Sequence, residues 1–206
     1  MTPTIIHLVR HGEVHNPRKV LYGRLPRFGL SVNGRRQARE TALFLAETPL
    51  RAVFTSPLLR ARQTAEEIRA RHPHLRLRRD SRLNEVRTIY EGVPGDQIDR
   101  KRGDIYTGVP APFEQPADIF RRVEGFLGFV RRHFAGEQVA AVSHGDVIIF
   151  TVLWALGWEL LPQNKSRLRE AGYATSYPSH ASVTGLIFAT DAPHERPTVT
   201  FTQPWR

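Results

Sequence analysis

The chain has 206 residues, contains no cysteine and carries a formal net charge of +10. This length suits one α/β domain with a sizeable core, and the lack of cysteine excludes disulfides and thiol chemistry. No apolar run approaches the roughly 20 residues that span a bilayer, and residues 1–4 lack the pattern of a secretory signal. We therefore expect a cytoplasmic protein with no membrane partner.

The positive charge comes almost entirely from arginine, and two interpretations compete. It attracts an anionic substrate or a nucleic acid, or it is a basic surface set by genome composition. The arginines occur as scattered pairs and form no single patch interleaved with aromatic residues. We therefore expect no nucleic-acid partner. Examples of these pairs are Arg35-Arg36, Arg78-Arg79, Arg121-Arg122 and Arg131-Arg132.

The first predicted element is a buried strand over residues 4–9, which ends abruptly in Arg10, His11 and Gly12. Gly12 permits either a sharp turn or the close approach of another group. Ligands of open α/β sheets bind beyond the carboxyl ends of the strands. This stretch is therefore the first candidate for a functional site.

Helices and strands alternate through the next part of the chain. Ser31 can cap a helix over 33–46, and Ser56-Pro57 is typical of a helix start, with a hydroxyl cap followed by proline. A short strand over 52–55 lies between these helices, and a weak strand follows at 75–78.

The least regular part of the chain is residues 86–115, which are rich in glycine and proline. A segment this long without its own structure is usually functional or disordered, and we interpret it as an insertion that forms a lid. Pro116 then opens an amphipathic helix.

A second buried strand over 138–143 ends in Ser143-His144-Gly145-Asp146, and an almost wholly apolar helix follows to about Leu156. We expect a polar loop over 162–180 and two late strands, over 183–189 and 198–201. This alternation predicts a three-layer α/β/α sandwich with a mostly parallel sheet. The short connection of the last two strands predicts an antiparallel edge.

Two predicted strands are therefore followed by the same dipeptide, histidine-glycine. As parallel neighbours they would bring His11 and His144 to the same end of the sheet. Arg60, in the first turn of its helix, can also reach this end, although helical geometry alone does not decide between Arg60 and Arg62. Arginines, imidazoles and a helix N-terminus together suit a dianion such as a phosphoryl group. A neutral imidazole can attack phosphorus, and Glu85 is the best-placed carboxyl to protonate the leaving oxygen.

Two other kinds of site are less favoured. His7, His11 and His15 are spaced by four residues, but no carboxylate or cysteine pattern supports a metal site. Ser143, His144 and Asp146 carry the letters of a serine triad, yet such near-adjacent residues cannot adopt its geometry.

The order of these motifs resembles the histidine phosphatase superfamily, the phosphoglycerate-mutase-like family. The resemblance rests on Leu8-Val9-Arg10-His11-Gly12-Glu13, on a second arginine block over 55–65, on Leu83-Asn84-Glu85 and on Val142-Ser143-His144-Gly145. It implies a phosphoglycerate-mutase-like fold and one histidine phosphatase domain over 1–206 with the lid-like insertion at about 86–115.

The resemblance also implies the role of each residue. His11 becomes phosphorylated, Glu85 donates and later accepts the proton, and Arg10, Arg60 and His144 hold the phosphoryl group, with no metal and no organic cofactor. Asn16 is a further expected phosphate contact, although it stands one residue nearer to the histidine than in the family.

The expected activity is that of a phosphomonoesterase of the histidine acid phosphatase type, acting on a small phosphorylated substrate. The sequence departs from the mutase branch after Glu85, which favours hydrolysis; a phosphomutase and a non-catalytic module that binds phosphorylated ligands remain alternatives. Tyr22, Arg24 and Arg87 are candidates to face the rest of the substrate. The sequence does not fix the oligomeric state, and a homodimer is one alternative.

Overall fold

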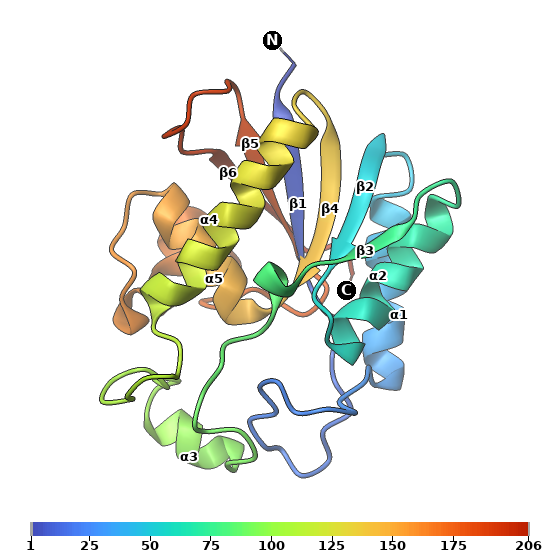
Figure 1. The fold of residues 1–206 in the computed structure, drawn as a ribbon. Coiled ribbons are helices and arrows are strands. Elements are labelled where there is room, and N and C mark those ends of the chain that lie inside the picture. Colours follow the sequence, from blue (N-terminus) through green and yellow to red (C-terminus); the bar gives the residue numbers. More distant parts are fainter. Residues whose placement is uncertain (1, 206) are drawn as a thin grey trace.

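A six-stranded sheet separates two layers of helices in the computed structural model of the chain, which describes residues 2–205 (Figure 1). The strands are β1 (Thr4–Arg10), β2 (Leu50–Thr55), β3 (Leu77–Arg79), β4 (Gln138–Ser143), β5 (Val183–Phe188) and β6 (Thr198–Thr202). The α-helices are α1 (Val32–Phe44), α2 (Leu59–Arg71), α3 (Gly95–Arg100), α4 (Pro116–His133) and α5 (Gly145–Ala155). Two 3₁₀ segments, η1 (Ser81–Leu83) and η2 (Pro162–Ala171), complete the order.

The strand order is β3-β2-β4-β1-β5-β6. Strands β1 to β4 run parallel to one another, whereas β5 is antiparallel to β1 and β6 is antiparallel to β5. The predicted mostly parallel sheet with an antiparallel edge is therefore confirmed. The two central strands are direct neighbours, and Arg10 pairs with Ser143 at their carboxyl ends.

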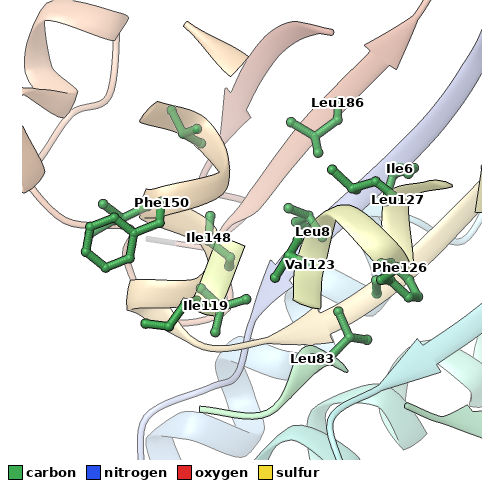
Figure 2. Close-up of a cluster of buried hydrophobic side chains, with 14 of the residues drawn as sticks. Ile6, Leu8, Leu83, Ile119, Val123, Phe126, Leu127, Ile148, Phe150 and Leu186 are labelled. Atoms are coloured by element: carbon green, nitrogen blue, oxygen red, sulfur yellow. The ribbon is translucent and has the colours of Figure 1, made fainter. Parts of the chain in front are cut away.

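Each face of the sheet is covered by its own apolar cluster. Side chains of α4 and α5, such as Val123 and Ile148, pack on one face with Leu8 and Leu186, as Figure 2 shows. On the other face, α1 and α2 pack against the side chains that alternate with these, including Val9. Burial on both faces explains why the central strands read as continuous apolar runs.

Two loop segments lie beyond the carboxyl ends of the parallel strands, at the lower end of the molecule in Figure 1. Residues 16–30 form one, and residues 86–115, which include α3, form the other. An isolated bridge between Val20 and Pro94 joins them, and Gly95 donates its backbone N–H to the Lys19 carbonyl. Segment 86–115 is therefore anchored, and a lid movement stays a prediction.

Two local predictions were wrong. Helix α2 begins at Leu59, later than expected, and its N-cap position is Leu58, without a side-chain cap; the Ser56 hydroxyl accepts only a long hydrogen bond from the Leu58 N–H at 3.3 Å and also binds another group, described below. Residues 162–180 are not wholly a loop, because η2 occupies 162–171 and buries Leu168. Among the described residues, no helix is long and apolar enough to cross a membrane.

Candidate active site

His11 follows β1 and is buried, and each of its ring nitrogens has one hydrogen-bond partner. Its Nδ1 lies 2.8 Å from the Gly12 carbonyl oxygen. Because a carbonyl can only accept, Nδ1 carries the proton and Nε2 keeps a free electron pair. Burial, reinforced by the charge of Arg60, holds the pKa of His11 well below its usual value of 6.5. The imidazole is therefore neutral, with Nε2 as its basic atom.

Gly12 is needed for a close approach and not for an unusual backbone angle. A Cβ atom built there would lie 2.4 Å from the carbonyl oxygen of Gly34 in α1. Gly145 is constrained in the same way, since a Cβ there would meet the Tyr177 hydroxyl at 2.1 Å. Both histidine-glycine motifs thus let a neighbouring segment pack directly against the turn.

His144 lies beside His11, with 5.2 Å between the ring centroids, as the parallel pairing of β1 and β4 predicts. Its Nε2 is 2.8 Å from the Ser56 hydroxyl, which in turn lies 3.1 Å from the Asn84 side-chain oxygen. This chain of hydrogen bonds orients the ring, and it explains the conformation of Ser56. Burial, with Arg60 beside it, holds the pKa of His144 well below 6.5.

Arg60, in the first turn of α2, is only 1 % exposed and joins the two imidazoles. Its Nε donates to His11 Nε2 at 3.1 Å, and one of its terminal nitrogens lies 3.2 Å from His144 Nδ1. The same nitrogen donates to the Gly23 carbonyl at 2.8 Å, and the guanidinium lies over the Tyr22 ring. A cation is thus fixed between two neutral histidines.

Glu85 faces the same group of side chains. One of its carboxyl oxygens lies 3.7 Å from an Arg60 nitrogen and 3.6 Å from His144 Nδ1. Burial raises the pKa of Glu85 above its usual value, Arg60 opposes this effect and Asp146 adds to it. The surroundings therefore favour a proton on this carboxyl, as a general acid requires.

Arg10 approaches from the other side of His11. Its guanidinium donates to the Pro178 carbonyl at 2.6 Å and lies 3.0 Å from His180 Nε2. Burial, reinforced by Arg10, lowers the pKa of His180 to about 3, so this ring is a neutral acceptor. The Nε atom of Arg10 is buried without a hydrogen-bond partner among the described residues. A buried donor of this kind would be satisfied by an anionic oxygen.

Asn16 is not brought to this group. Its side-chain nitrogen donates to the Val20 carbonyl at 2.8 Å, and its side-chain oxygen accepts from the Val20 N–H at 3.2 Å. In this structure its amide closes a turn of the 16–30 loop, and the phosphate contact stays a prediction. The other five residues singled out as site residues lie together: Arg10, His11, Arg60, Glu85 and His144.

A cavity of about 260 Å³ opens next to His11, Arg10 and Glu85. Tyr22 lines it, as the sequence suggested, whereas Arg24 and Arg87 do not. Arg24 instead donates to the Glu85 backbone carbonyl at 2.6 Å and so helps to fix that residue. Further lining comes from both loop segments and from α5.

Asp146 is a buried residue of this cavity wall whose position the sequence analysis missed. Its carboxylate accepts hydrogen bonds from the hydroxyls of Tyr106 and Tyr177, the latter at 2.8 Å, and from Lys165 at 3.2 Å. Residue 106 belongs to segment 86–115, whereas residues 165 and 177 belong to 162–180. Asp146 therefore ties both segments to the first turn of α5.

Three groups of the site could in principle hold a metal ion. Ligand atoms of His11, Glu85 and His144 lie within 4.8 Å of one another. The Arg60 guanidinium, however, donates into the same imidazole nitrogens that a metal would need. A divalent cation would face this fixed positive charge, whereas an anion would be attracted to it. The donor set therefore fits a phosphoryl group better than a metal.

Comparison with known proteins agrees with this geometry. A sequence model of the histidine phosphatase superfamily (branch 1) matches residues 6–177. The chain is 38 % identical over 196 residues to the uncharacterized protein Rv0525 of Mycobacterium tuberculosis, covering 91 % of this chain and 92 % of that protein. It is 32 % identical over 147 residues to phosphoserine phosphatase 1 of Hydrogenobacter thermophilus, covering 66 % and 69 %.

Among solved structures, the fold is similar to that of the mycobacterial glucosyl-3-phosphoglycerate phosphatase Rv2419c. The TM-score is 0.75 with 98 % of each chain covered, at 22 % sequence identity. At this level of identity the similarity concerns the fold, and it agrees with the observed sheet order and helical layers.

Proposed function

Because the chain belongs to the histidine phosphatase superfamily (branch 1) and shares its phosphatase fold, we propose that it hydrolyses phosphomonoesters through a phosphohistidine on His11. The observation that carries the proposal is the state of this side chain. A neutral imidazole with its proton fixed on Nδ1 presents the Nε2 electron pair for attack.

The surrounding cations stabilise the transferred group. Arg60 and Arg10 donate hydrogen bonds to the phosphoryl oxygens in place of their present partners, which also frees His11 Nε2 to attack. A bound dianion favours the protonated form of His144, so that its Nδ1 changes from an acceptor to a donor. Binding of the substrate thereby adds a positive charge, on His144, to the site.

Glu85 serves as general acid and then as general base. Its raised pKa supports a protonated carboxyl in the resting site, ready to protonate the leaving alkoxide as the P–O bond breaks. The resulting carboxylate then takes a proton from the water that attacks the phosphohistidine. Phosphate leaves, and His11 and Glu85 return to their starting states.

This chemistry requires no metal, and hydrolysis of p-nitrophenyl phosphate in the presence of a chelator tests it. We expect turnover unchanged by the chelator, and a loss of about a thousandfold or more in His11→Ala. Inorganic phosphate should still bind to that variant, as measured by calorimetry. His15→Ala is the matched control, because His15 is exposed four residues further along and should leave activity unchanged.

Three results would contradict the proposal. They are substantial turnover by His11→Ala, loss of activity in chelator with recovery on adding a divalent metal, and phosphate binding without turnover by the wild type. The last would instead favour the binding module. Transfer of the phosphoryl group to an added alcohol in preference to water would favour the phosphomutase.

A further inference from the structure

The cavity has an uneven distribution of charge along its wall. Arg10 is the only arginine or lysine among the described residues that line it, and it lies at the phosphoryl end beside His11. The lining also includes the apolar side chains of Leu21, Val86 and Ile105 and the hydroxyl-bearing side chains of Tyr22, Thr88 and Tyr177. A substrate bound through its phosphoryl group would therefore place its alcohol part against mainly apolar surface.

Three further basic residues near the cavity bind partners outside it. Arg24 donates to Glu114 at 2.8 Å as well as to the Glu85 carbonyl, and Arg122 pairs with Glu114 at 2.8 Å. Lys165 binds Asp146 and the Gly103 carbonyl. None of these cations lines the cavity, so none is available to a second anionic group of a substrate.

The other charged groups that line the cavity are carboxyls. They are Glu85 and, from the first turn of α5, Asp146. A substrate carboxylate here would lose its hydration and gain no cationic partner, because Arg10 is needed for the phosphoryl group and Lys165 is already paired with Asp146. The volume of about 260 Å³ lies below the roughly 300–1,000 Å³ of pockets for drug-sized ligands, which favours a small alcohol part.

We infer that the site selects phosphomonoesters of small alcohols without an anionic group and discriminates against phosphorylated hydroxy acids. The inference rests on the proposed function and adds a substrate class to it. It also separates this chain from proteins named for phosphoserine and for a phosphoglycerate, whose substrates carry a carboxylate.

A pair of substrates tests the inference directly, because glycerol phosphate differs from 3-phosphoglycerate only in having a hydroxymethyl group in place of the carboxylate. We expect kcat/KM for phosphate release to be about tenfold or more higher for glycerol phosphate. When the two compounds compete with p-nitrophenyl phosphate, glycerol phosphate should have the lower inhibition constant. Equal values, or a preference for 3-phosphoglycerate, would overturn the inference.

Ile105→Arg adds a cation to the apolar wall, and Ile105→Met is the matched uncharged control. The arginine variant should reduce the preference for glycerol phosphate about tenfold, whereas the methionine variant should keep it. An unchanged preference in a folded arginine variant would contradict the inference. If that variant does not fold, the comparison of the two substrates with the wild-type enzyme remains the test. Failure to hydrolyse even p-nitrophenyl phosphate would instead overturn the proposed function, and the inference with it.

Discussion

At the scale of single residues, the chemistry depends on which nitrogen of each histidine carries a proton. The Gly12 carbonyl fixes this choice for His11, and the Ser56 hydroxyl can do so for His144. The Arg60 guanidinium then donates to the unprotonated nitrogen of each ring, His11 Nε2 and His144 Nδ1. Burial and this arginine together keep both imidazoles neutral, and the arginine holds them in place until an anion replaces its contacts.

Glu85→Gln tests the acid at this scale. We expect a loss of about 10²- to 10⁴-fold for an alkyl phosphate, whose leaving group needs a proton, and a much smaller loss for p-nitrophenyl phosphate. The pH profile provides a second measurement. Wild-type activity on the alkyl ester should fall as the pH rises through the raised pKa of Glu85, and the variant should lack this fall.

The sign of this pH effect follows from the groups around the carboxyl. Burial and Asp146 disfavour its ionised form, while Arg60 and Arg10 favour it, and the net effect raises the pKa. Equal losses on both esters, or an unchanged alkaline limb in Glu85→Gln, would remove Glu85 from the acid role.

At the scale of elements, Asp146 joins parts of the chain that are far apart in sequence. The Tyr106 hydroxyl fastens segment 86–115 to the first turn of α5, and the Tyr177 hydroxyl fastens the segment that also carries His180. Arg10 lies over the Tyr177 ring and binds His180, so the same tie supports the phosphoryl end of the cavity. Segment 86–115 and the phosphoryl end of the cavity are therefore connected through the carboxylate of Asp146.

Tyr106→Phe removes the hydroxyl that binds the Asp146 carboxylate from segment 86–115. A hydrogen bond to a charged group contributes about 1.5–3 kcal/mol, so local opening of segment 86–115 should become about tenfold to a hundredfold more frequent. Tryptic cleavage after Lys101 and Arg102, both exposed, should accelerate accordingly, as mass spectrometry of the new termini would show.

Tyr173→Phe is the control for this experiment. Its hydroxyl is 3.1 Å from the Thr184 hydroxyl in β5, away from the tie, so its loss should not change cleavage at these two sites. Equal acceleration in both variants would point to general destabilisation, and no acceleration in Tyr106→Phe would contradict the tie.

At the scale of the whole molecule, the sequence was sufficient for the fold and for most of the site. Two buried strands that end in histidine-glycine had to be neighbours if both motifs served one ligand, and β1 and β4 are paired in that way. Regular periodicity and motifs tied to strand ends carry this information, because local backbone geometry fixes where such side chains point.

The missed parts depend on tertiary contacts that leave no local pattern. Ser56 before a proline is typical of a helix cap, yet its hydroxyl accepts from His144, 88 residues away. Tyr177 and His180 lie in a segment expected to be a loop, and only contacts with Arg10 bring them to the site, where Tyr177 also lines the cavity. Asp146 was visible only as the residue after a motif, because its partners come from two distant segments.

The covalent phosphohistidine on His11 is the feature on which the proposed mechanism depends, and it can be trapped. Rapid acid-free quenching during turnover of a phosphomonoester, followed by trypsin digestion and mass spectrometry, should recover a phosphoryl group on the peptide of residues 11–18. This peptide also contains His15, so fragment ions must assign the group to His11, and His15→Gln should label equally well. We expect an acid-labile, base-stable phosphoryl group on His11. Turnover without this group, or a label on another residue, would rule out His11 as the nucleophile.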